Sequence, residues 1–460
     1  MSLPDIHDYL KPGLHAHLLG IGGVSMCPLA QVLQRSGMTV SGSDIQESSA
    51  VRLLRSCGIE VFLGHHAENV RGADLLIRTA AVRDDNREIV AAREQGIPVF
   101  ERAQAWGCLM RSYRNAVCIS GTHGKTTTTS MITHIAMAAE SDPTVMIGGT
   151  LPLLGAGFRV GHGDTVILEA CEYRDSFLSF FPTISVLLNV EEDHLDYFEN
   201  LDHLKRSFRA FAELTAPDGT IVANADDDGV TGALEGIERP VLTFGFDRPA
   251  RVRGENLTFS RGRPSFDVTV DGAPYAHIVL HIPGRHNACN ALAASAAAYA
   301  LGLDGAVVER GLANFVGAER RFQFKGTYNG ADVYDDYAHH PSELRALLTM
   351  AESLGYRRII CAFQPHTYTR TKALFADFVR ELRRPDITLL AEIYAAREKN
   401  EIGIYSSDLA DQIPGAMAFP SLLELTEALQ ELASPGDLIL TVGAGDIYTA
   451  GEALVASASR

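Results

Sequence analysis

The amino-acid sequence predicts an α/β protein made of three domains. The chain has 460 residues, which is long for a single hydrophobic core and typical of about three domains. Apolar residues make up 46% of it, so each domain can bury its own core. Strand-like and helix-like segments alternate along most of the chain, which favours βαβ units and parallel sheets. We expect the domains at residues 1–114, 115–318 and 319–460.

The first domain alternates between apolar and amphipathic runs. These runs predict strands at residues 15–22, 38–44, 73–82 and 97–102, and helices at residues 26–37, 50–58 and 86–96. In open parallel sheets, ligands bind beyond the carboxyl ends of the strands. The loops that follow the strands are therefore the candidate sites.

A glycine-rich loop follows the first strand. Gly20, Gly22 and Gly23 form it, and Asp44 ends the second strand. A dinucleotide fingerprint would place a third glycine where this chain has Ser25, so the loop predicts a nucleotide or its diphosphate more than NAD. A turn that only lets strand and helix pack closely is the alternative.

A second loop, "CISGTHGKTTTTS" at residues 118–130, has the layout of a phosphate cradle. The usual pattern would place a glycine at Ile119, so the strict motif fails. Backbone N–H groups at a helix N-terminus and one cation are what a triphosphate needs, and Gly121 and Gly124 permit the turn. We expect Lys125 to bind the β- and γ-phosphates and the hydroxyl of Thr126 to bind Mg2+.

The central region adds acidic and amide side chains near this loop. Further strands are expected at 164–172, 183–190 and 219–227, a hairpin set at 252–284 and a buried Ala-rich helix at 290–303. Glu169 and Glu172 end one strand, and His194 follows another. If both strands belong to the sheet that carries the phosphate loop, Glu169 and His194 would face the γ-phosphate. A histidine suits Mn2+ better than Mg2+. Asn287 and Asn290 share a helix face that could bind a purine edge, or they cap the helix.

The third domain repeats the pattern of strands that end in polar loops, here at residues 331–341, 356–371, 386–398 and 437–448. Its loops carry the candidate residues Arg320, Arg321, Asp335, Asp336, Tyr337, His339, His340, His366, Arg370 and Lys372. Arginine and histidine in such loops suit the anchoring of carboxylate and phosphate. The histidines and aspartates match no zinc spacing.

Composition excludes several classes of function. The formal net charge of −17 disfavours sequence-independent binding of nucleic acid. The seven cysteines are scattered, which is typical of reduced core residues in a cytoplasmic protein. The first residues predict no secretory signal, and no run approaches the roughly 20 apolar residues of a membrane span. We expect a cytoplasmic protein that binds neither membranes nor nucleic acid.

Seven segments, in this order, resemble the Mur ligases, the ATP-dependent amide-forming enzymes of peptidoglycan precursor synthesis: "GTHGKTTTT", "EACE", "NVEEDHLDYF", "PGRHNACNA", "ERRFQ", "DDYAHHP" and "FQPHTYTRT". They cover nearly the whole chain. The first loop, "GIGGVSM", with "SGSD" after the second strand, is most similar to the alanine-adding branch. The resemblance implies a Rossmann-like N-terminal domain for the UDP end of the substrate, a central P-loop ATPase-type domain with a parallel sheet, and a Rossmann-like C-terminal domain that closes over the site.

The resemblance also implies the ligands and the residues that bind them. ATP would be bound by Gly121, Thr122, His123, Gly124, Lys125, Thr126, Thr127, Asn287, Asn290, Arg321 and Asp336. Mg2+, or Mn2+ in its place, would be bound by Thr126, Glu169 and His194. UDP-N-acetylmuramate and L-alanine would be bound by Gly20, Gly22, Gly23, Ser43, Asp44, Tyr337, His366 and Arg370. The catalytic residues would be Lys125, Glu169, His194, Arg321 and His339. The protein would be a monomer or a weak homodimer. Of the two adjacent arginines, Arg321 directly precedes the aromatic residue, as in the family.

The implied reaction forms an acyl phosphate on the lactyl carboxylate of UDP-N-acetylmuramate, which the amine of L-alanine then attacks, with Glu169 or His194 as the base. Several sister ligases carry a carbamoylated lysine at the position where this chain has Phe208, and the nearby Lys205 does not align with that lysine. The residue that would bind a second metal ion is therefore not identified from the sequence. The alternatives are a ligase that recycles a preformed tripeptide, a folylpolyglutamate synthase, an NAD-dependent oxidoreductase and a non-catalytic nucleotide-binding module.

Overall fold

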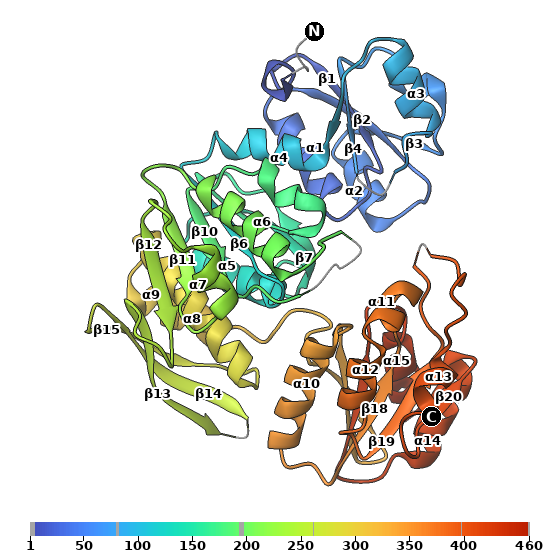
Figure 1. Ribbon diagram of the computed structural model, residues 1–460. Helices are drawn as coiled ribbons and strands as arrows, with labels where there is room; N and C mark the ends of the chain where they lie inside the picture. The colour runs from blue at the N-terminus through green and yellow to red at the C-terminus, as the bar shows by residue number, and fades with distance from the viewer. Residues whose placement is uncertain (1–4, 80–81, 193–196, 261, 397, 459–460) are drawn as a thin grey trace. The chain divides into compact units, whose positions relative to one another are not determined.

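The computed structural model describes residues 5–79, 82–192, 197–260, 262–396 and 398–458, and it contains three β-sheets flanked by helices (Figure 1). By their contacts, the residues divide into two compact units. The first comprises residues 1–255, 267–277 and 290–314, and the second comprises residues 256–266, 278–289 and 315–460. The first unit holds the N-terminal sheet and most of the central sheet, and the second holds the C-terminal sheet.

The N-terminal sheet is parallel throughout and has the order β3-β2-β1-β4-β5. This is the strand order of a Rossmann-like sheet, as the sequence predicts. Its strands are β1 (His15–Leu19), β2 (Thr39–Asp44), β3 (Glu60–Leu63), β4 (Leu75–Arg78) and β5 (Val99–Glu101). Its helices are α1 (Met26–Arg35), α2 (Ser49–Ser56), α3 (Arg87–Glu94) and α4 (Arg102–Met110), with the short 3-10 turns η1 (Ile6–Asp8) and η2 (Ala67–Val70). The sequence patterns did not predict β3 or α4.

The central sheet has ten strands in the order β15-β14-β13-β12-β11-β10-β6-β9-β7-β8. Its parallel centre comprises β6 (Asn115–Ser120), β9 (Thr165–Glu169), β10 (Ile184–Leu187), β11 (Thr220–Asn224) and β12 (Val241–Gly245). One edge ends in the antiparallel pair β7 (Thr144–Leu151) and β8 (Ala156–Arg159), so the sheet is mixed where the sequence predicts a parallel one. The other edge carries β13 (Val252–Ser260), β14 (Arg263–Val270) and β15 (Ala273–Val279), the expected hairpin region.

Helices cover this sheet, as Figure 1 shows. They are α5 (Lys125–Ala138), α6 (Leu201–Glu213), α7 (Asp228–Ala233), α8 (Arg285–Ala300) and α9 (Gly305–Ala313), and the 3-10 segment η3 (Tyr173–Ser179) follows β9. Residues 291–298 of the Ala-rich part of α8 are fully buried, as expected, because small side chains let a helix approach its neighbours closely, whereas Tyr299 is 38% exposed.

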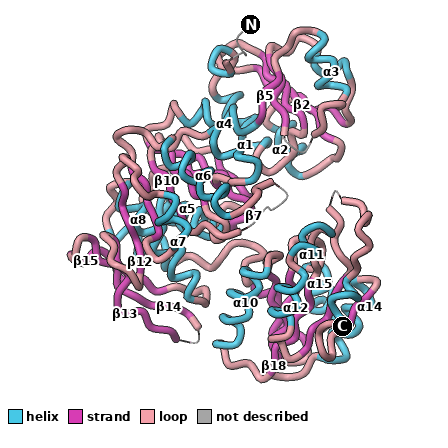
Figure 2. The backbone as a smooth tube through the Cα atoms, in the orientation of Figure 1, coloured by secondary structure: helices cyan, strands magenta, loops and turns pink. Residues whose placement is uncertain are grey.

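The C-terminal sheet has the order β16-β17-β21-β18-β19-β20, and only the pair of β16 (Gln323–Tyr328) and β17 (Ala331–Asp336) is antiparallel. The other strands are β18 (Arg358–Phe363), β19 (Ile387–Ala391), β20 (Met417–Phe419) and β21 (Asp437–Val442). Alternate residues of β18 enter two separate cores, with Cys361 in one and Ile360 in the other. Helices therefore pack on both faces (Figure 2). They are α10 (Pro341–Ser353), α11 (Tyr368–Ala373), α12 (Phe375–Leu382), α13 (Ser406–Ala410), α14 (Leu422–Leu432) and α15 (Tyr448–Ser457).

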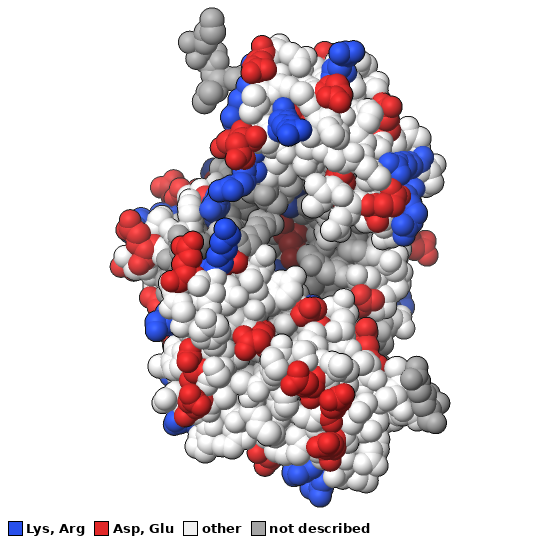
Figure 3. Space-filling model, turned by 90° about the vertical axis from the view of Figure 1, so that its right-hand side faces the viewer, with Lys and Arg blue, Asp and Glu red and all other residues white. Residues whose placement is uncertain are grey.

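Acidic and basic side chains are interspersed on the face of the molecule in Figure 3. Within the part of the chain that the structure describes, no helix combines the length and the apolar character needed to cross a bilayer. The seven cysteines are free, and Cys27, Cys118 and Cys361 are buried in the cores.

Candidate active site

The loop at residues 121–124 joins β6 to α5 in the tight turn that a phosphate cradle needs. Gly121 has φ +148° and Gly124 has φ +84°, a region that side-chain-bearing residues rarely adopt. A Cβ at Gly124 would also lie 2.6 Å from Oδ1 of Asn290. Ile119 is still a fully buried residue of β6, so this shorter loop has no position for the glycine of the usual motif. The first N–H groups of α5 point toward this turn and are available to an anion.

Asn189, which follows β10, fixes the phosphate loop from the side. Its Oδ1 accepts from the N–H of His123 at 2.7 Å, and its Nδ2 donates to the carbonyl of His123 at 3.1 Å. The N–H of Thr122 donates to the carbonyl of Asn189 at 3.1 Å, and the hydroxyl of Thr122 bonds to the backbone of Glu191. These bonds hold the cradle in shape. The sequence places Asn189 at a strand end, but its hydrogen bonds to the phosphate loop can be recognised only from the structure.

Lys125, the first residue of α5, folds back over this loop. Its Nζ donates to the carbonyls of Gly121 at 2.5 Å and Thr122 at 3.1 Å, and it lies 2.9 and 3.1 Å from the two carboxylate oxygens of Glu172. Burial by itself lowers the pKa of Lys125, but the charge and hydrogen bond of Glu172, with the nearby Cys171 and Glu169, together outweigh it and raise that pKa to about 12. Lys125 is therefore a permanent cation at the phosphate site.

Glu169 ends β9 beside Ile119 of β6, so it lies at the same sheet edge as the loop. Its Oε1 accepts from the N–H of Gly148 in β7 at 2.7 Å. A Cβ at Gly149, the next residue, would lie 3.5 Å from Cγ2 of Thr126, so β7 borders both predicted oxygen ligands. The Gly-Gly pair was not predicted, because its only signal in the sequence is "IGGT", in a strand that the apolar pattern does not indicate.

The residues around Glu169 fit a divalent cation, because a carboxylate and a hydroxyl are the oxygen ligands that Mg2+ prefers. Thr126 lies in the first turn of α5, is largely buried, and is followed by the equally buried Thr127. The third predicted ligand, His194, lies outside the described residues. Among the residues that are described, no group of three His, Cys, Asp or Glu side chains could hold a metal ion.

The two asparagines of α8 differ in their surroundings. Both are buried. Asn290 faces Gly124 of the phosphate loop. The Nδ2 of Asn287 donates to the carbonyl of Pro283 at 2.6 Å, one turn before it, which is a bond typical of a helix start. Asn290 is therefore the one placed beside the phosphate loop.

The position expected to carry a modified lysine is part of the hydrophobic core. Phe208 in α6 is fully buried, and its ring meets that of Phe177 edge to face at 5.4 Å. The amino end of the neighbouring Lys205 lies beside Gly232, where an added Cβ would be 3.4 Å from its Nζ. A lysine at position 208 would therefore replace a core ring.

The N-terminal glycine loop and the end of β2 come together as the sequence predicts. The N–H of Gly20 donates to the carbonyl of Ser43 at 2.8 Å, and that of Gly22 donates to Oδ2 of Asp44 at 2.9 Å. A Cβ at Gly22 would lie 2.9 Å from the same carboxylate oxygen. Gly23 donates its N–H back to Gly20 and leads into α1. The loop thus presents backbone close to Asp44.

A buried polar cluster that was not predicted from the sequence lies on the interior side of this loop and supports it. Glu88 of α3 is fully buried and accepts hydrogen bonds from Ser43 at 2.7 Å and from Asn69 at 2.6 Å, and His17 lies 3.3 Å from it. Burial raises the pKa of Glu88, but the bonds from His17, Ser43 and Asn69 outweigh it, so the pKa is lowered overall. The hydroxyl of Ser43 therefore faces Glu88 in the interior.

In the C-terminal unit, the two adjacent arginines have different environments. Arg320 donates to Asp335, a fully buried residue, at 2.9 Å and to the carbonyls of Gly443 and Gly445. The guanidinium of Arg321 lies 5.4 Å from the ring centre of Tyr337 and keeps 29% of its side chain exposed. Arg320 is thus fixed within the domain, which leaves Arg321 as the arginine that can meet a ligand.

The other predicted residues of this unit gather at the carboxyl ends of β17 and β18. Asp336 accepts from the N–H groups of Phe322 and Ala338, and burial, opposed by Arg321, raises its pKa to about 6. The ring of His339 lies 5.5 Å from that of Tyr337 and 5.8 Å from that of His366.

His366 has two further neighbours. Its ring stacks on that of Tyr394 at 5.6 Å, and Arg370 lies 3.5 Å from its Nδ1. Burial, with the charges of His339 and Arg370, lowers the pKa of His366 to about 4, so its ring is neutral at physiological pH. Tyr394 is the member of this group that the sequence analysis did not assign.

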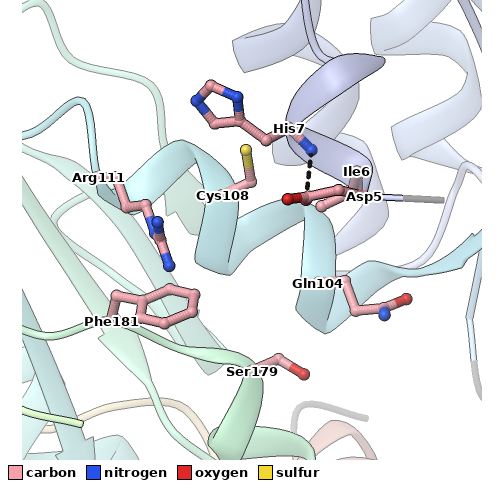
Figure 4. A pocket seen from close by; sticks show the side chains of 8 residues that line it. All are labelled: Asp5, Ile6, His7, Gln104, Cys108, Arg111, Ser179 and Phe181. Carbon is pink, nitrogen blue, oxygen red and sulfur yellow. Dashed lines mark hydrogen bonds between the residues drawn. The ribbon is translucent and has the colours of Figure 1, made fainter. Parts of the chain in front are cut away.

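A pocket of about 520 Å³ lies among η1, α4 and the end of η3 (Figure 4). Its lining includes Gln104, Cys108 and Arg111, and Arg111 lies over the ring of Phe181 at 3.8 Å. None of the lining residues is a predicted site residue. The candidate active site is therefore identified by the loop contacts described above and not by this pocket.

The fold and these sites define a phosphate-binding α/β protein with a charged loop lysine in its central sheet and a separate glycine loop in a Rossmann-like sheet. The chain belongs to the Mur ligase family. The Mur ligase family catalytic domain matches residues 15–114, the Mur ligase middle domain residues 119–298, and the Mur ligase glutamate ligase domain residues 320–445.

Similar proteins match nearly the whole chain. The UDP-N-acetylmuramate–L-alanine ligase of Agathobacter rectalis is 43% identical over 97% of this chain and 99% of its own. That of Acetivibrio thermocellus is 45% identical over 95% of each chain. The crystal structure of UDP-N-acetylmuramate-alanine ligase MurC from Thermotoga maritima matches with a TM-score of 0.79 and 31% identity, over 96% of this chain and 99% of that one. A murein peptide ligase from Psychrobacter arcticus shares the fold, with a TM-score of 0.72 and 23% identity over 97% and 99%.

Proposed function

We propose that this protein is an ATP-dependent ligase that joins L-alanine to the lactyl carboxylate of UDP-N-acetylmuramate, a step in the synthesis of peptidoglycan precursors. The observation that carries the ATP-dependent chemistry is the charged Lys125, held over a glycine turn at the N-terminus of α5. The choice of substrates is supported by relatives of that name that are 41–45% identical over nearly the full chain. We place the reaction in the cytoplasm, where ATP and nucleotide sugars are found.

The reaction has two chemical steps. A carboxylate oxygen of the lactyl group attacks the γ-phosphorus of ATP, and ADP leaves with the electrons of the broken P–O bond. The neutral amine of L-alanine then attacks the acyl carbon, an N–C bond forms, and phosphate leaves as the C–O bond breaks. The amine gives up a proton to a base. Phosphate is a far better leaving group than hydroxide, which is why the carboxylate is activated first.

The central domain supplies the stabilisation of charge. Lys125 and the first N–H groups of α5, at residues 125–127, bind the phosphates and offset the charge that develops during transfer. Thr126 and Glu169, with His194, hold Mg2+ or Mn2+, which when bound neutralises phosphate charge. Asn290, beside the loop, and Asn287 contact the adenine end of ATP.

The other two domains supply the substrate contacts. The turn at Gly20, Gly22 and Gly23, which has no side chains in the way, lets the diphosphate of UDP-N-acetylmuramate approach the backbone and the start of α1, and Asp44 binds the ribose. Ser43 supports that loop through its bond to the buried Glu88. In the C-terminal domain, Arg321 and Asp336 contact ATP. Tyr337, His339, His366 and Arg370 bind the muramoyl and amino-acid groups.

Release of phosphate from ATP tests this proposal. The protein is mixed with ATP, Mg2+ and UDP-N-acetylmuramate, and with L-alanine, with the tripeptide L-alanyl-γ-D-glutamyl-meso-diaminopimelate, or with no amine. We expect release with L-alanine and a product heavier by one alanyl residue. Release with the tripeptide alone would identify a recycling ligase, and no release in any mixture would contradict the ligase function.

A further inference from the structure

All three protons of the Lys125 ammonium are already in use. Nζ has three N–H groups, and its partners are the carbonyl of Gly121, the carbonyl of Thr122 and the carboxylate of Glu172. A phosphate that binds to Lys125 must therefore displace at least one of these partners.

Glu172 is the partner that a phosphate would displace. The two carbonyls belong to the loop that carries Lys125, whereas Glu172 lies on a separate segment after β9 and bears a negative charge. Its carboxylate is 1% exposed, and the side chain of Lys125 is 16% exposed, so water screens the pair only weakly. A phosphate oxygen brought to Nζ would meet a buried charge of the same sign, and like charges held this close repel each other strongly.

The segment that carries Glu172 is held in an unusual conformation. Arg174 and Asp175 follow it with φ +53° and +55°, two successive side-chain-bearing residues in the left-handed region. Asp175 accepts hydrogen bonds from Tyr197 at 2.6 Å and from Ser207, and its N–H donates to the carbonyl of Glu172 at 2.9 Å. The surrounding structure thus fixes the turn that keeps Glu172 against Lys125.

We propose that Glu172 is a positioning residue that takes the place of a nucleotide phosphate on Lys125 in the free protein, and that a nucleotide must displace it to bind. This inference rests on the proposed function, because it takes Lys125 as the residue that binds phosphate. Two consequences follow. The charge of Glu172 weakens nucleotide binding, and its return to Lys125 accelerates the release of ADP.

Calorimetric titration with ADP, and with the β,γ-imido analogue of ATP, in the presence of Mg2+ tests this inference on the full chain. The variant Glu172→Gln keeps the shape and a hydrogen-bonding oxygen but removes the charge. We expect its Kd for either nucleotide to fall about tenfold, a typical size for the removal of one close like-charge contact. The dissociation of ADP, measured by stopped flow, should slow by a similar factor.

Two further variants separate charge from shape. Glu172→Asp keeps the charge, and we expect its Kd to stay within about threefold of wild type. Glu213→Gln makes the same substitution in an exposed ion pair with Arg209 of α6, and we expect no change in Kd.

A Kd for Glu172→Gln that is unchanged or higher, with thermal unfolding like that of wild type, would show that Glu172 only orients Lys125 and would overturn the inference. If Glu172→Gln does not fold, Asp175→Asn takes its place, because it weakens the anchor of the same segment, and it too must lower the Kd. A wild-type protein that binds neither nucleotide, or a Lys125→Ala variant with the wild-type Kd, would contradict the proposed function instead.

Discussion

The N–H of Gly148 in β7 donates to the Oε1 of Glu169 at 2.7 Å, and a Cβ on that glycine would lie 2.6 Å from the other carboxylate oxygen. The carboxylate is thus held by a residue that has room for it only because it has no side chain. Glu169 is the proposed carboxylate ligand of the metal, so Gly148 sets the position of that ligand.

Gly148→Ala should therefore displace Glu169 without disturbing the backbone, because Gly148 does not have a positive φ. We expect turnover to fall about 10- to 100-fold, the usual effect of losing support for a metal ligand, and the Mg2+ concentration for half-maximal rate to rise. Gly149→Ala is the matched control. Its added Cβ would be 3.5 Å from Thr126, an ordinary contact, and its rate should stay near that of wild type. Equal losses in the two variants would contradict the role of Gly148.

Lys125→Ala should abolish turnover and also destabilise the free protein, because it removes the cation of the buried ion pair with Glu172. Loss of one member of a buried ion pair typically costs about 3–5 kcal/mol. Calorimetry should show that UDP-N-acetylmuramate still binds, since the N-terminal glycine loop does not involve Lys125. The double variant Lys125→Ala with Glu172→Gln should regain most of the lost thermal stability while it stays inactive. A double variant as unstable as Lys125→Ala would count against the pair.

Arg320 and Arg321 should respond in opposite ways to substitution by alanine. Arg320→Ala removes the partner of the buried Asp335 and should lower the melting temperature of the C-terminal domain by several degrees. Arg321→Ala removes a half-buried guanidinium and should leave the melting temperature within about 2 °C of wild type while lowering kcat at least about tenfold. Thermal unfolding and steady-state rates on both variants check this. A loss of stability confined to Arg321→Ala would reverse the assignment.

Sequence patterns predicted the elements whose signal is local. Examples are the apolar runs of β1, β6, β9 and β10 and the glycine turns after β1 and β6. Apolar side chains indicate burial, and glycine indicates backbone freedom, without any knowledge of the tertiary contacts. The hairpin of β7 and β8 was missed because "IGGTLPLLGAG" contains glycines and a proline, which are typical of a loop. Its place at the sheet edge comes from tertiary pairing.

The roles of Glu172 and Glu88 were beyond sequence reasoning for a related physical reason. Glu169 and Glu172 look equivalent at a strand end, and only the left-handed turn at residues 174–175 directs Glu172 to Lys125. Glu88 stands in a polar helix segment, where an exposed side chain is the ordinary expectation, yet it is buried through contacts with residues 19 to 71 positions away. The fold was therefore more predictable than the contacts that fix the site.

We expect His134 to make the stability of the first unit depend on pH. It lies in α5 and is 7% exposed, and burial lowers its pKa from 6.5 to about 4. In the unfolded chain it binds a proton below pH 6.5, whereas in the folded chain it stays neutral down to about pH 4. The unfolded state thus binds more protons in this window, so the free energy of unfolding falls as the pH falls from 6.5 to 4, by up to about 3 kcal/mol.

The variant His134→Gln isolates this contribution, because glutamine does not titrate. We expect its melting temperature to fall less than that of wild type between pH 7.5 and pH 5, whatever constant offset the substitution introduces at both pH values. His281→Gln removes an exposed histidine and should retain the wild-type decrease. Parallel pH profiles for wild type and His134→Gln would show that His134 is not the neutral buried group on which this prediction depends.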